Sequence, residues 1–191
     1  LGEGGMGQVY LGFDGHTGQQ VALKVLDEGL AANQAYVDRF YREARSGALL
    51  DHPNIVHTFR AGLDRASGRH YLVMEFVEGQ TLQQKLNANG PLEPAEVVRL
   101  GRQIALGLAA AHDKGLIHRD IKPANVLVEA GIETRAKGTD FGLARAGDDA
   151  SLTQSGVIAG TPMFMSPEQA RGAELDHRSD LFSLGSVLYT M

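Results

Sequence analysis

Cysteine is absent from the 191-residue sequence, long apolar runs are missing, and there is no excess of positive charge. Without cysteine, this stretch cannot contain disulfide bonds, cysteine-ligated zinc or a thiol nucleophile. No run approaches the roughly 20 apolar residues that a membrane-spanning helix needs, and nothing resembles a signal peptide. The 23 acidic residues outnumber the 18 basic ones, whereas nucleic-acid binding needs a concentrated basic face. The composition therefore argues against a membrane helix, a disulfide-stabilised domain and a nucleic-acid-binding domain.

The hydrophobic content of 43% is sufficient for a packed globular core. The net charge of -5 does not exclude a bound polyphosphate, because a few cations, backbone N–H groups and magnesium are enough for one nucleotide. The sequence begins at Leu1 and ends at Met191 in an apolar region, residues 184–189, without a signal that ends a helix. We therefore expect a fragment of a longer protein, truncated at both ends.

The first part of the chain has the pattern of a small sheet with one helix. Apolar residues alternate along residues 9–13 and recur along 21–26, on either side of a glycine-containing turn, which predicts a β-hairpin. Apolar residues at helical spacing predict a helix over residues 36–50. Two further strands are expected, at residues 55–59 and 71–76, separated by a polar turn.

The second part of the chain has a mainly helical pattern. Pro94 suits the first turn of a helix whose apolar stripe continues until Gly115, and a strand-like run follows at residues 126–128. The change in character predicts two lobes, residues 1–78 and 79–191. Ligands commonly bind between two such lobes.

The start of the chain is rich in glycine, and residues 1–9, LGEGGMGQV, fit the pattern G-x-G-x-x-G-x-V. Gly2, Gly4 and Gly7 would let the backbone approach phosphate groups that a Cβ would obstruct. Alone the match is weak, because 24 residues are glycine and a plain turn is an equally good interpretation. A dinucleotide-binding fold needs a helix after the glycines, and a Walker-type loop needs Gly-Lys-Ser/Thr, and the sequence has neither. A glycine loop between two strands is therefore expected.

Lys24 is the only charged residue of the run 21–26 and would share a strand face with Ala22 and Leu26. One interpretation is a lysine whose charged end reaches solvent along an apolar stem. The other pairs it with Glu43, which falls beside the apolar face of the predicted helix. Such a pair is either a structural salt bridge or a lysine held toward nucleotide phosphates. Its position after the glycine loop favours the second role.

The strongest local signal is HRDIKPAN at residues 118–125, which gathers an acid, two cations and an amide. The spacing suits a carboxylate at Asp120 that accepts a hydroxyl proton and an amide at Asn125 that binds magnesium. A solvated polar loop is the alternative. Further on, Asp140 in the triplet DFG supplies a second oxygen ligand of the kind that Mg²⁺ prefers.

Taken in order, these motifs resemble the eukaryotic-type (Hanks-type) protein kinase family over the whole chain, and their residues are most like those of bacterial serine/threonine kinases. The resemblance implies an α+β, bilobal kinase-like fold with a small β-rich N-lobe containing one helix and a mainly helical, incomplete C-lobe. It also implies transfer of the γ-phosphoryl group of Mg·ATP to Ser or Thr hydroxyls of protein substrates, including the protein itself.

The resemblance also implies roles for the polar residues. Asp120 would be the catalytic base, and Lys122, in a Lys-Pro-x-Asn arrangement typical of the serine/threonine subgroup, would reach the transferred phosphate. Lys24, paired with Glu43, would contact the α- and β-phosphates. The metal ligands implied are Asn125 and Asp140.

The nucleotide-binding set implied by the resemblance comes from the glycine loop, the strands and the connection between the lobes. The backbone of Glu75 and of Val77 would bond adenine, and Met74 takes the gatekeeper position, which is compatible with simple core packing. The set consists of Leu1, Gly2, Gly4, Gly7, Val9, Ala22, Lys24, Met74, Glu75, Val77 and Leu127.

Residues 160–168, GTPMFMSPE, resemble the end of an activation segment, with Ser-Pro-Glu in place of the commoner Ala-Pro-Glu. The preceding segment contains Ser151, Thr153 and Ser155, and Arg119 beside the expected base is a natural partner for a phosphate there. Hydroxyl groups in a loop are otherwise simply solvated. We expect autophosphorylation at Thr153 or Ser155.

The sequence departs from the family pattern at two glycines and near its end. Gly138 stands where an apolar strand residue is usual, and Gly47 is expected to leave a gap beside Phe141. The helix expected to begin near Asp180 resembles the central helix of the large lobe, whose neighbours the sequence lacks, and Glu168 lacks its usual arginine partner. We therefore expect this chain alone to aggregate or to unfold with low cooperativity.

Two other functions fit the same motifs. A pseudokinase uses this fold without turnover, but it usually lacks one of the Lys, Asp and Asn residues that are present here. A small-molecule kinase of related fold is disfavoured by the long segment that ends in residues 160–168. The partners implied are ATP with Mg²⁺ and Ser/Thr protein substrates, with self-association for trans-autophosphorylation, no nucleic acid and no membrane contact in this fragment. The resemblance implies a cytoplasmic location, either free or as the cytoplasmic domain of a membrane-anchored kinase.

Overall fold

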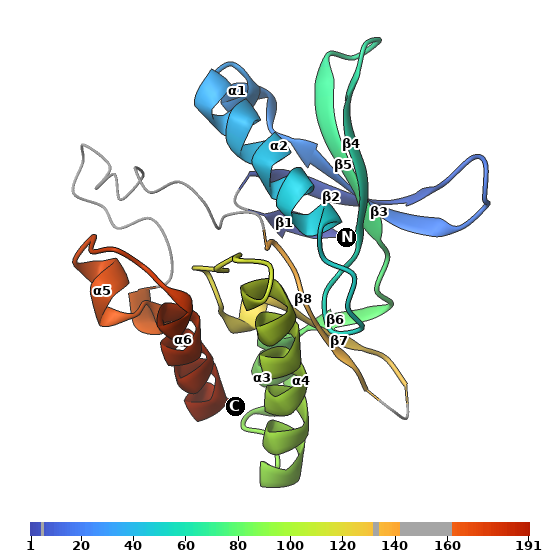
Figure 1. Ribbon diagram of the computed structural model, residues 1–191. Coiled ribbons are helices and arrows are strands. Elements are labelled where there is room, and N and C mark those ends of the chain that lie inside the picture. The colour runs from blue at the N-terminus through green and yellow to red at the C-terminus, as the bar shows by residue number, and fades with distance from the viewer. Residues whose placement is uncertain (5, 132–133, 142–161) are drawn as a thin grey trace.

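The structure is a computed structural model that describes residues 1–4, 6–131, 134–141 and 162–191. The described residues form two parts (Figure 1). The upper part in Figure 1 holds the N-terminus and a five-stranded sheet with helices packed on it. The lower part holds a three-stranded sheet, the longer helices of the second half and the C-terminal end.

The five-stranded sheet is antiparallel, with its strands in the order β1-β2-β3-β5-β4. In chain order these strands are β1 (Gly2–Gly4), β2 (Gly7–Phe13), β3 (Gln20–Leu26), β4 (Thr58–Asp64) and β5 (Arg69–Glu75). At the centre of the sheet, Lys24 of β3 is paired with Val9 of β2 and with Leu72 of β5. The alternation of a strand thereby turns Lys24 to the same side as its buried neighbour Leu26.

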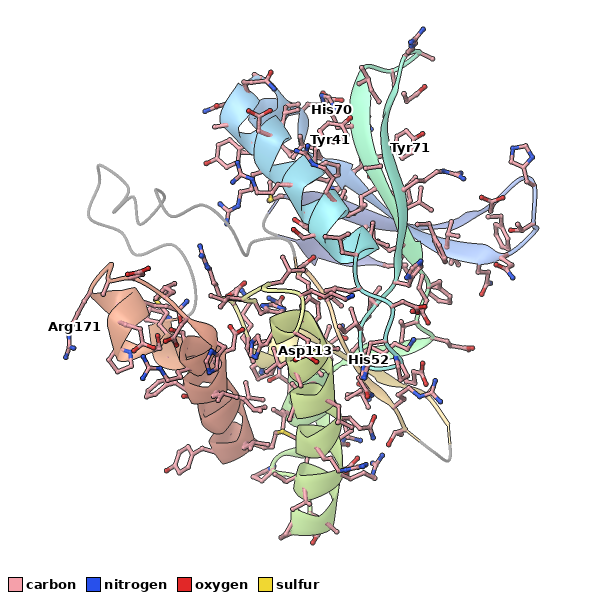
Figure 2. The ribbon with its side chains drawn as sticks, in the orientation of Figure 1. Tyr41, His52, His70, Tyr71, Asp113 and Arg171 are labelled. Atoms are coloured by element: carbon pink, nitrogen blue, oxygen red, sulfur yellow. The ribbon has the colours of Figure 1, made fainter. Side chains whose placement is uncertain are left out.

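Helix α2 (Gln34–Ala48) packs on this sheet and follows the short helix α1 (Glu28–Ala31). Helix α2 is tied to β5, because Tyr41 Oη and His70 Nδ1 lie 2.9 Å apart with their rings edge to face (Figure 2). The buried side of the helix meets the sheet in one hydrophobic core. That core consists of Met6, Leu26, Val37, Phe40, Ala44 and Leu72.

The lower part is built around three helices, α3 (Leu82–Asn89), α4 (Pro94–His112) and α6 (His177–Thr190). Helices α4 and α6 approach closely at Gly101, where a Cβ would lie 2.5 Å from Leu188 Cδ2. Their shared core includes Leu82, Leu100, Ile104, Leu108, Ile121, Val126, Leu184 and Val187. This core holds the loop between α4 and the second sheet in place.

The second sheet is antiparallel, with strands β6 (Gly79–Thr81), β7 (Val126–Glu129) and β8 (Ala136–Gly138) in that order. The end of β8 is bonded to the segment that follows α2. Gly138 N donates to Asn54 O, and Gly138 O accepts from Val56 N, each at 2.9 Å. The residues that follow β8 are therefore held beside both parts of the molecule.

The last described segment begins with two short helical turns, η2 (Pro162–Phe164) and α5 (Pro167–Ala170), before α6. Large apolar side chains are exposed on η2 and on the outer side of α6. They are Met163, Leu181, Phe182 and Tyr189. Within the described ranges, no helix is long and apolar enough to cross a membrane.

The hairpin, the helices at α2 and α4 and the strand at β7 are confirmed. The strand expected at residues 55–59 exists but was placed too early, because β4 starts only at Thr58, whereas Ile55 bridges Gly138 of β8. Helix α3 was not predicted. The predicted lobe boundary after residue 78 falls between β5 and β6, which belong to different sheets.

Candidate active site

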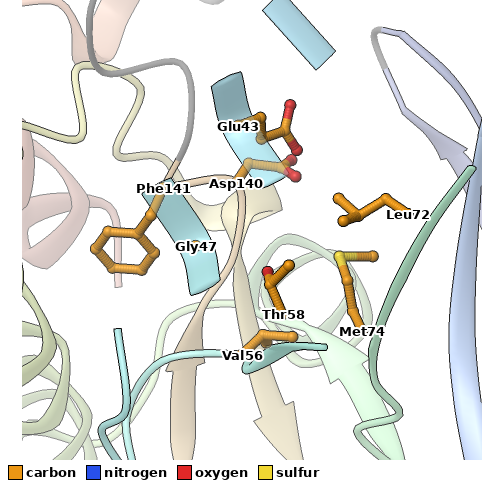
Figure 3. Close-up of a pocket in the computed structure, with 8 residues that line it drawn as sticks. All are labelled: Glu43, Gly47, Val56, Thr58, Leu72, Met74, Asp140 and Phe141. Atoms are coloured by element: carbon orange, nitrogen blue, oxygen red, sulfur yellow. The ribbon is translucent and has the colours of Figure 1, made fainter. Parts of the chain in front are cut away.

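A buried lysine on β3 is the centre of the first group of polar side chains. Lys24 Nζ lies 2.6 Å from Glu43 Oε1 and 2.9 Å from Asp140 Oδ1. Lys24 is 5% exposed and Glu43 is 3% exposed, so the interpretation of a lysine that reaches solvent is wrong. Figure 3 shows the carboxylates of Glu43 and Asp140 side by side. We call Lys24, Glu43 and Asp140 the lysine cluster.

The charges of the lysine cluster shift one another's pKa values. Burial would lower the pKa of Lys24, but the carboxylates of Asp140 and Glu43 outweigh burial and raise it. Burial would raise the pKa of Asp140, but the nearby ammonium of Lys24 outweighs burial and the pKa is lowered. For Glu43, burial and the neighbouring Asp140 carboxylate outweigh Lys24 and raise the pKa. Lys24 is therefore protonated in an environment that largely excludes water, and the carboxyl groups of Glu43 and Asp140 are its two neighbours.

Three separate elements supply the lysine cluster. Lys24 comes from the centre of the sheet, and Glu43 lies on the buried side of α2 next to Ala44. Asp140 follows β8 and has a φ of 61°, in the left-handed backbone region that residues other than glycine rarely adopt. Such strained positions persist where the surrounding contacts fix them, and they concentrate at functional sites.

The second group of polar side chains lies in the loop between α4 and β7. Lys122 Nζ donates to Asp120 Oδ2 at 2.7 Å. Asn125 Nδ2 donates to Asp120 Oδ2 at 3.0 Å and to Asp120 O at 2.8 Å. Because Asn125 uses its amino group on Asp120, its amide oxygen is left for another partner. We call Asp120, Lys122 and Asn125 the loop cluster.

A fully buried aspartate on α6 holds the backbone just ahead of the loop cluster. Asp180 accepts hydrogen bonds from His118 N and Arg119 N, each at 2.8 Å, and its Oδ2 lies 2.7 Å from His112 Nε2. Burial would raise the pKa of Asp180, but the hydrogen bonds with His112, His118 N and Arg119 N outweigh it and lower the pKa. Asp180 was predicted only as part of a helix, and its role as an anchor was missed.

His118 and Thr139 join the two clusters. His118 Nδ1 accepts from Asp120 N at 3.3 Å, so its proton is on Nε2, which donates to Thr139 O at 2.8 Å. Thr139 N in turn donates to Asn125 O at 3.0 Å. Because Asp140 follows Thr139 directly, these bonds place the lysine cluster and the loop cluster at one site.

The glycines predicted to cover phosphates lie in β1 and at the start of β2. A Cβ on Gly7 would lie 1.9 Å from Val25 O, so the pairing of β2 with β3 requires glycine there whatever the ligand. A Cβ on Gly2 would meet nothing within 4 Å. Gly7 must therefore be glycine for a structural reason that is independent of phosphate binding.

The other predicted nucleotide-binding residues are spread over both sheets and the connection between them. Ala22 is paired with Met74 across β3 and β5, and Met74 also packs against the core of the first sheet. Leu1 N donates to Val9 O at 2.8 Å. Val77 lies in the connection between β5 and β6, and Leu127 is in β7 of the second sheet.

Glu75, at the end of β5, is bonded through both its backbone and its side chain. Its N donates to His57 O at 2.8 Å, which leaves its carbonyl oxygen as the candidate partner for adenine. Its Oε1 lies 2.5 Å from Nζ of Lys137, a buried residue of β8. Lys137 was missed in the sequence, although a lone charge within a short strand is the same signal that identified Lys24.

The two glycines that depart from the family pattern both lie close to other side chains. A Cβ on Gly47 would lie 2.5 Å from Thr58 Oγ1, so Thr58 fills most of the expected gap. The remaining pocket (Figure 3) has a volume of about 10 Å³, room for roughly one water molecule. A Cβ on Gly138 would lie 2.7 Å from Phe141 Cε2, so glycine lets the Phe141 ring pack directly on β8.

The predicted phosphorylation sites Ser151, Thr153 and Ser155 lie outside the described residues. Beyond them, Glu168 Oε1 accepts a hydrogen bond from Ser179 Oγ at 2.6 Å. Glu168, which was expected to lack its arginine partner, therefore has a hydroxyl partner on α6.

Comparison with known families identifies one match, to the family described as "Protein kinase domain", over residues 1–191. Similar curated proteins include serine/threonine-protein kinase pkn2 of Myxococcus xanthus, which is 47% identical over 194 residues, covering 99% of this chain and 23% of that protein. PknB of Mycobacterium leprae is 42% identical, covering 99% of this chain and 30% of PknB. PrkC of Bacillus subtilis is 41% identical, covering 100% of this chain and 29% of PrkC. The chain thus spans less than a third of these three relatives.

The fold is similar to that of a solved structure, the crystal structure of the Mycobacterium tuberculosis PknI kinase domain. The TM-score is 0.77 and the sequence identity is 32%. The match covers 98% of this chain and 69% of the PknI chain.

Proposed function

The chain belongs to the protein kinase family, and from that premise we propose that the protein carrying it transfers the γ-phosphoryl group of Mg·ATP to Ser or Thr hydroxyls of proteins. Its α+β fold is that of a protein kinase domain, as the resemblance implied. The observation that carries the proposal is the junction of the lysine cluster and the loop cluster through His118 and Thr139.

Asp120 is the proposed catalytic base. Lys122 and Asn125 both donate to its Oδ2, and these bonds hold the carboxylate in one orientation. A carboxylate held in this way can orient a substrate hydroxyl and accept its proton as the phosphoryl group is transferred. Lys122, held next to Asp120, can stabilise the negative charge that develops on the transferred group.

Lys24 is the proposed ligand of the α- and β-phosphates. An ammonium group has three N–H donors, and Glu43 and Asp140 accept from Lys24 in the present arrangement. A donor remains for a phosphate oxygen. Since the lysine is buried and its pKa is raised, its full charge is available in an environment where it is weakly screened.

The residues present fit a magnesium ion. The Asp140 carboxylate and the free amide oxygen of Asn125 are hard oxygen donors, and Mg²⁺ uses one or two such protein ligands together with water and substrate phosphates. A metal held there neutralises phosphate charge. The hydrogen bond from Thr139 N to Asn125 O holds the backbone of Asn125 next to the residue that precedes Asp140, which supports a shared metal.

We further propose that the hydroxyl acceptors are Ser and Thr, because Lys122 stands in the Lys-Pro-x-Asn arrangement and the relatives compared above are named serine/threonine kinases. A cytoplasmic location suits an enzyme that needs ATP. Trans-autophosphorylation at Thr153 or Ser155, through self-association, belongs to the same proposal.

The test is transfer of radiolabelled γ-phosphate by the full-length protein to a Ser/Thr protein substrate, followed by identification of the labelled amino acid. Asp120→Asn should lower the rate by about 10² to 10⁴, because a general base contributes about that much. Binding of Mg·ATP, measured separately, should be retained. Turnover that survives the substitution would exclude Asp120 as the base.

The same experiment separates the pseudokinase alternative. A pseudokinase would bind Mg·ATP with the unsubstituted sequence and transfer no label. The presence of Lys24, Glu43, Asp120, Asn125 and Asp140 in one bonded network supports turnover instead.

A further inference from the structure

Gln169 on α5 is hydrogen-bonded to the backbone of the catalytic loop, 50 residues earlier in the chain. Its Nε2 donates to Arg119 O at 2.6 Å, and its Oε1 accepts from Ser166 N at 3.1 Å. Both ends of the amide are therefore used, one on the N-cap residue of α5 and one on the residue before Asp120.

The residue that Gln169 contacts has a strained backbone. Arg119 has a φ of 67°, which for a residue with a side chain costs on the order of 1–2 kcal/mol. Such a conformation persists only when its surroundings fix it. The peptide unit before Arg119 is fixed by Asp180, which accepts from Arg119 N at 2.8 Å.

The peptide unit after Arg119 is fixed at both of its ends. Its carbonyl oxygen accepts from Gln169 Nε2, and its N–H, which is that of Asp120, donates to His118 Nδ1 at 3.3 Å. The orientation of this peptide unit sets the direction in which the side chain of Asp120 leaves the backbone. The bond from Gln169 is short at 2.6 Å, whereas the bond to His118 is long.

We propose that Gln169 is a positioning residue for Asp120, whose amide fixes the peptide unit between Arg119 and Asp120 and so aims the catalytic carboxylate. The proposal rests on the function proposed above. Through this hydrogen bond, α5 at the end of the activation segment would be connected to the residue that precedes the catalytic base.

One substitution can remove the hydrogen-bond donor of the Gln169 amide and keep its acceptor. Gln169→Glu keeps an oxygen that accepts from Ser166 N, as glutamate does at this position of a capping box. It loses the donor to Arg119 O and sets a negative charge against that carbonyl oxygen.

Ser166→Ala is the matched control. It removes the hydroxyl that accepts from Gln169 N at 3.3 Å, but leaves both bonds of the Gln169 side chain in place. Loss of such a cap destabilises a helix start by about 1 kcal/mol, so the control also measures a general loss of stability in α5.

The first measurement is steady-state kinetics of the full-length protein. In Gln169→Glu we expect kcat to fall by about ten-fold to a hundred-fold, because small misplacements of a catalytic group have effects of that size. KM for ATP should stay within about two-fold, since nucleotide binding does not use this contact. Ser166→Ala should keep kcat near that of the unsubstituted protein. An unchanged kcat in Gln169→Glu, or an equal fall in both variants, would overturn the proposal.

The second measurement does not depend on turnover. Hydrogen–deuterium exchange of the backbone amides of residues 118–122 should be faster in Gln169→Glu and unchanged in Ser166→Ala. If the unsubstituted protein transfers no phosphate, the proposed function fails, and exchange alone then decides the positioning role. Exchange that is equal in the two variants would overturn that role even if the enzyme is active.

Discussion

The lysine cluster and the loop cluster are built in different ways. The lysine cluster joins residues that are 19 and 116 positions apart in the chain, and both its lysine and Glu43 are almost fully buried. The loop cluster joins residues that are two and five positions apart, and its ion pair is partly exposed. The lysine cluster therefore depends on a balance of buried charges, whereas the loop cluster depends on the backbone framework of His118 and Asp180 that surrounds it.

The largest effect on stability should come from breaking the charge balance. Lys24→Met leaves the buried carboxyl group of Glu43 next to that of Asp140 without a cation, and removal of one partner from a buried pair costs about 3–5 kcal/mol. Urea denaturation of the full-length protein at neutral pH should show this loss in the transition of the kinase domain. Lys122→Met is the control, because that lysine belongs to a partly exposed pair, and such pairs contribute about 1 kcal/mol or less. Equal losses in the two variants would contradict the difference between the clusters.

The second-largest effect on stability should come from the backbone framework that surrounds the loop cluster. Asp180→Asn removes the charge that strengthens the hydrogen bonds from His118 N and Arg119 N. Its amide oxygen can accept from only one of these groups, and its NH2 group then faces the other donor, at a cost of about 2–3 kcal/mol at neutral pH. The pKa of Asp180 is lowered from 3.8, so its stabilisation is fully present above that value and is lost as the pH falls through the lower folded pKa. The difference in unfolding free energy between Asp180→Asn and the unsubstituted protein should therefore shrink below pH 3.8. A difference that stays constant into the acid range would show that the charge of Asp180 has no such role.

The smallest effect tests the joint between the two clusters. Gly138→Ala would bring a Cβ to 2.7 Å from the ring of Phe141, which packs edge to face on His118 with 4.6 Å between ring centroids. Overpacking of this kind costs about 1–2 kcal/mol. The control is Gly185→Ala on α6, where a Cβ would meet nothing within 4 Å and the higher helix propensity of alanine should stabilise by up to about 1 kcal/mol. Thermal unfolding of both variants would separate the effects, and a neutral Gly138→Ala would mean that Phe141 can move freely.

The same comparison explains what could be predicted from the sequence. The loop cluster is local, so its residues stand together as one motif, and the role of Asp120 could be proposed without a structure. The pairing of Lys24 with Glu43 could be proposed because each was a charge at an otherwise apolar position. Their contact with Asp140 depends on the path of β8, which periodicity cannot give.

The supporting residues could not be predicted because their roles depend on tertiary contacts. Asp180 looked like an ordinary residue in the first turn of a helix, and no sequence motif singled out Gln169. The strand at β4 was placed too early because Ile55 is apolar, as a strand residue would be, but serves the second sheet. Helix α3 has only Leu82 and Leu86 as buried residues, too few to show a helical period.

The central claim is that the lysine cluster and the loop cluster serve one Mg·ATP site. The most direct measurement is a crystal structure of the full-length protein, or of its complete kinase domain, with magnesium and a non-hydrolysable ATP analogue. The account predicts a phosphate oxygen on Lys24 Nζ, a metal bound by oxygens of Asn125 and Asp140, and Asp120 facing the terminal phosphate. A nucleotide whose phosphates contact neither cluster, or a metal bound away from Asn125 and Asp140, would contradict it.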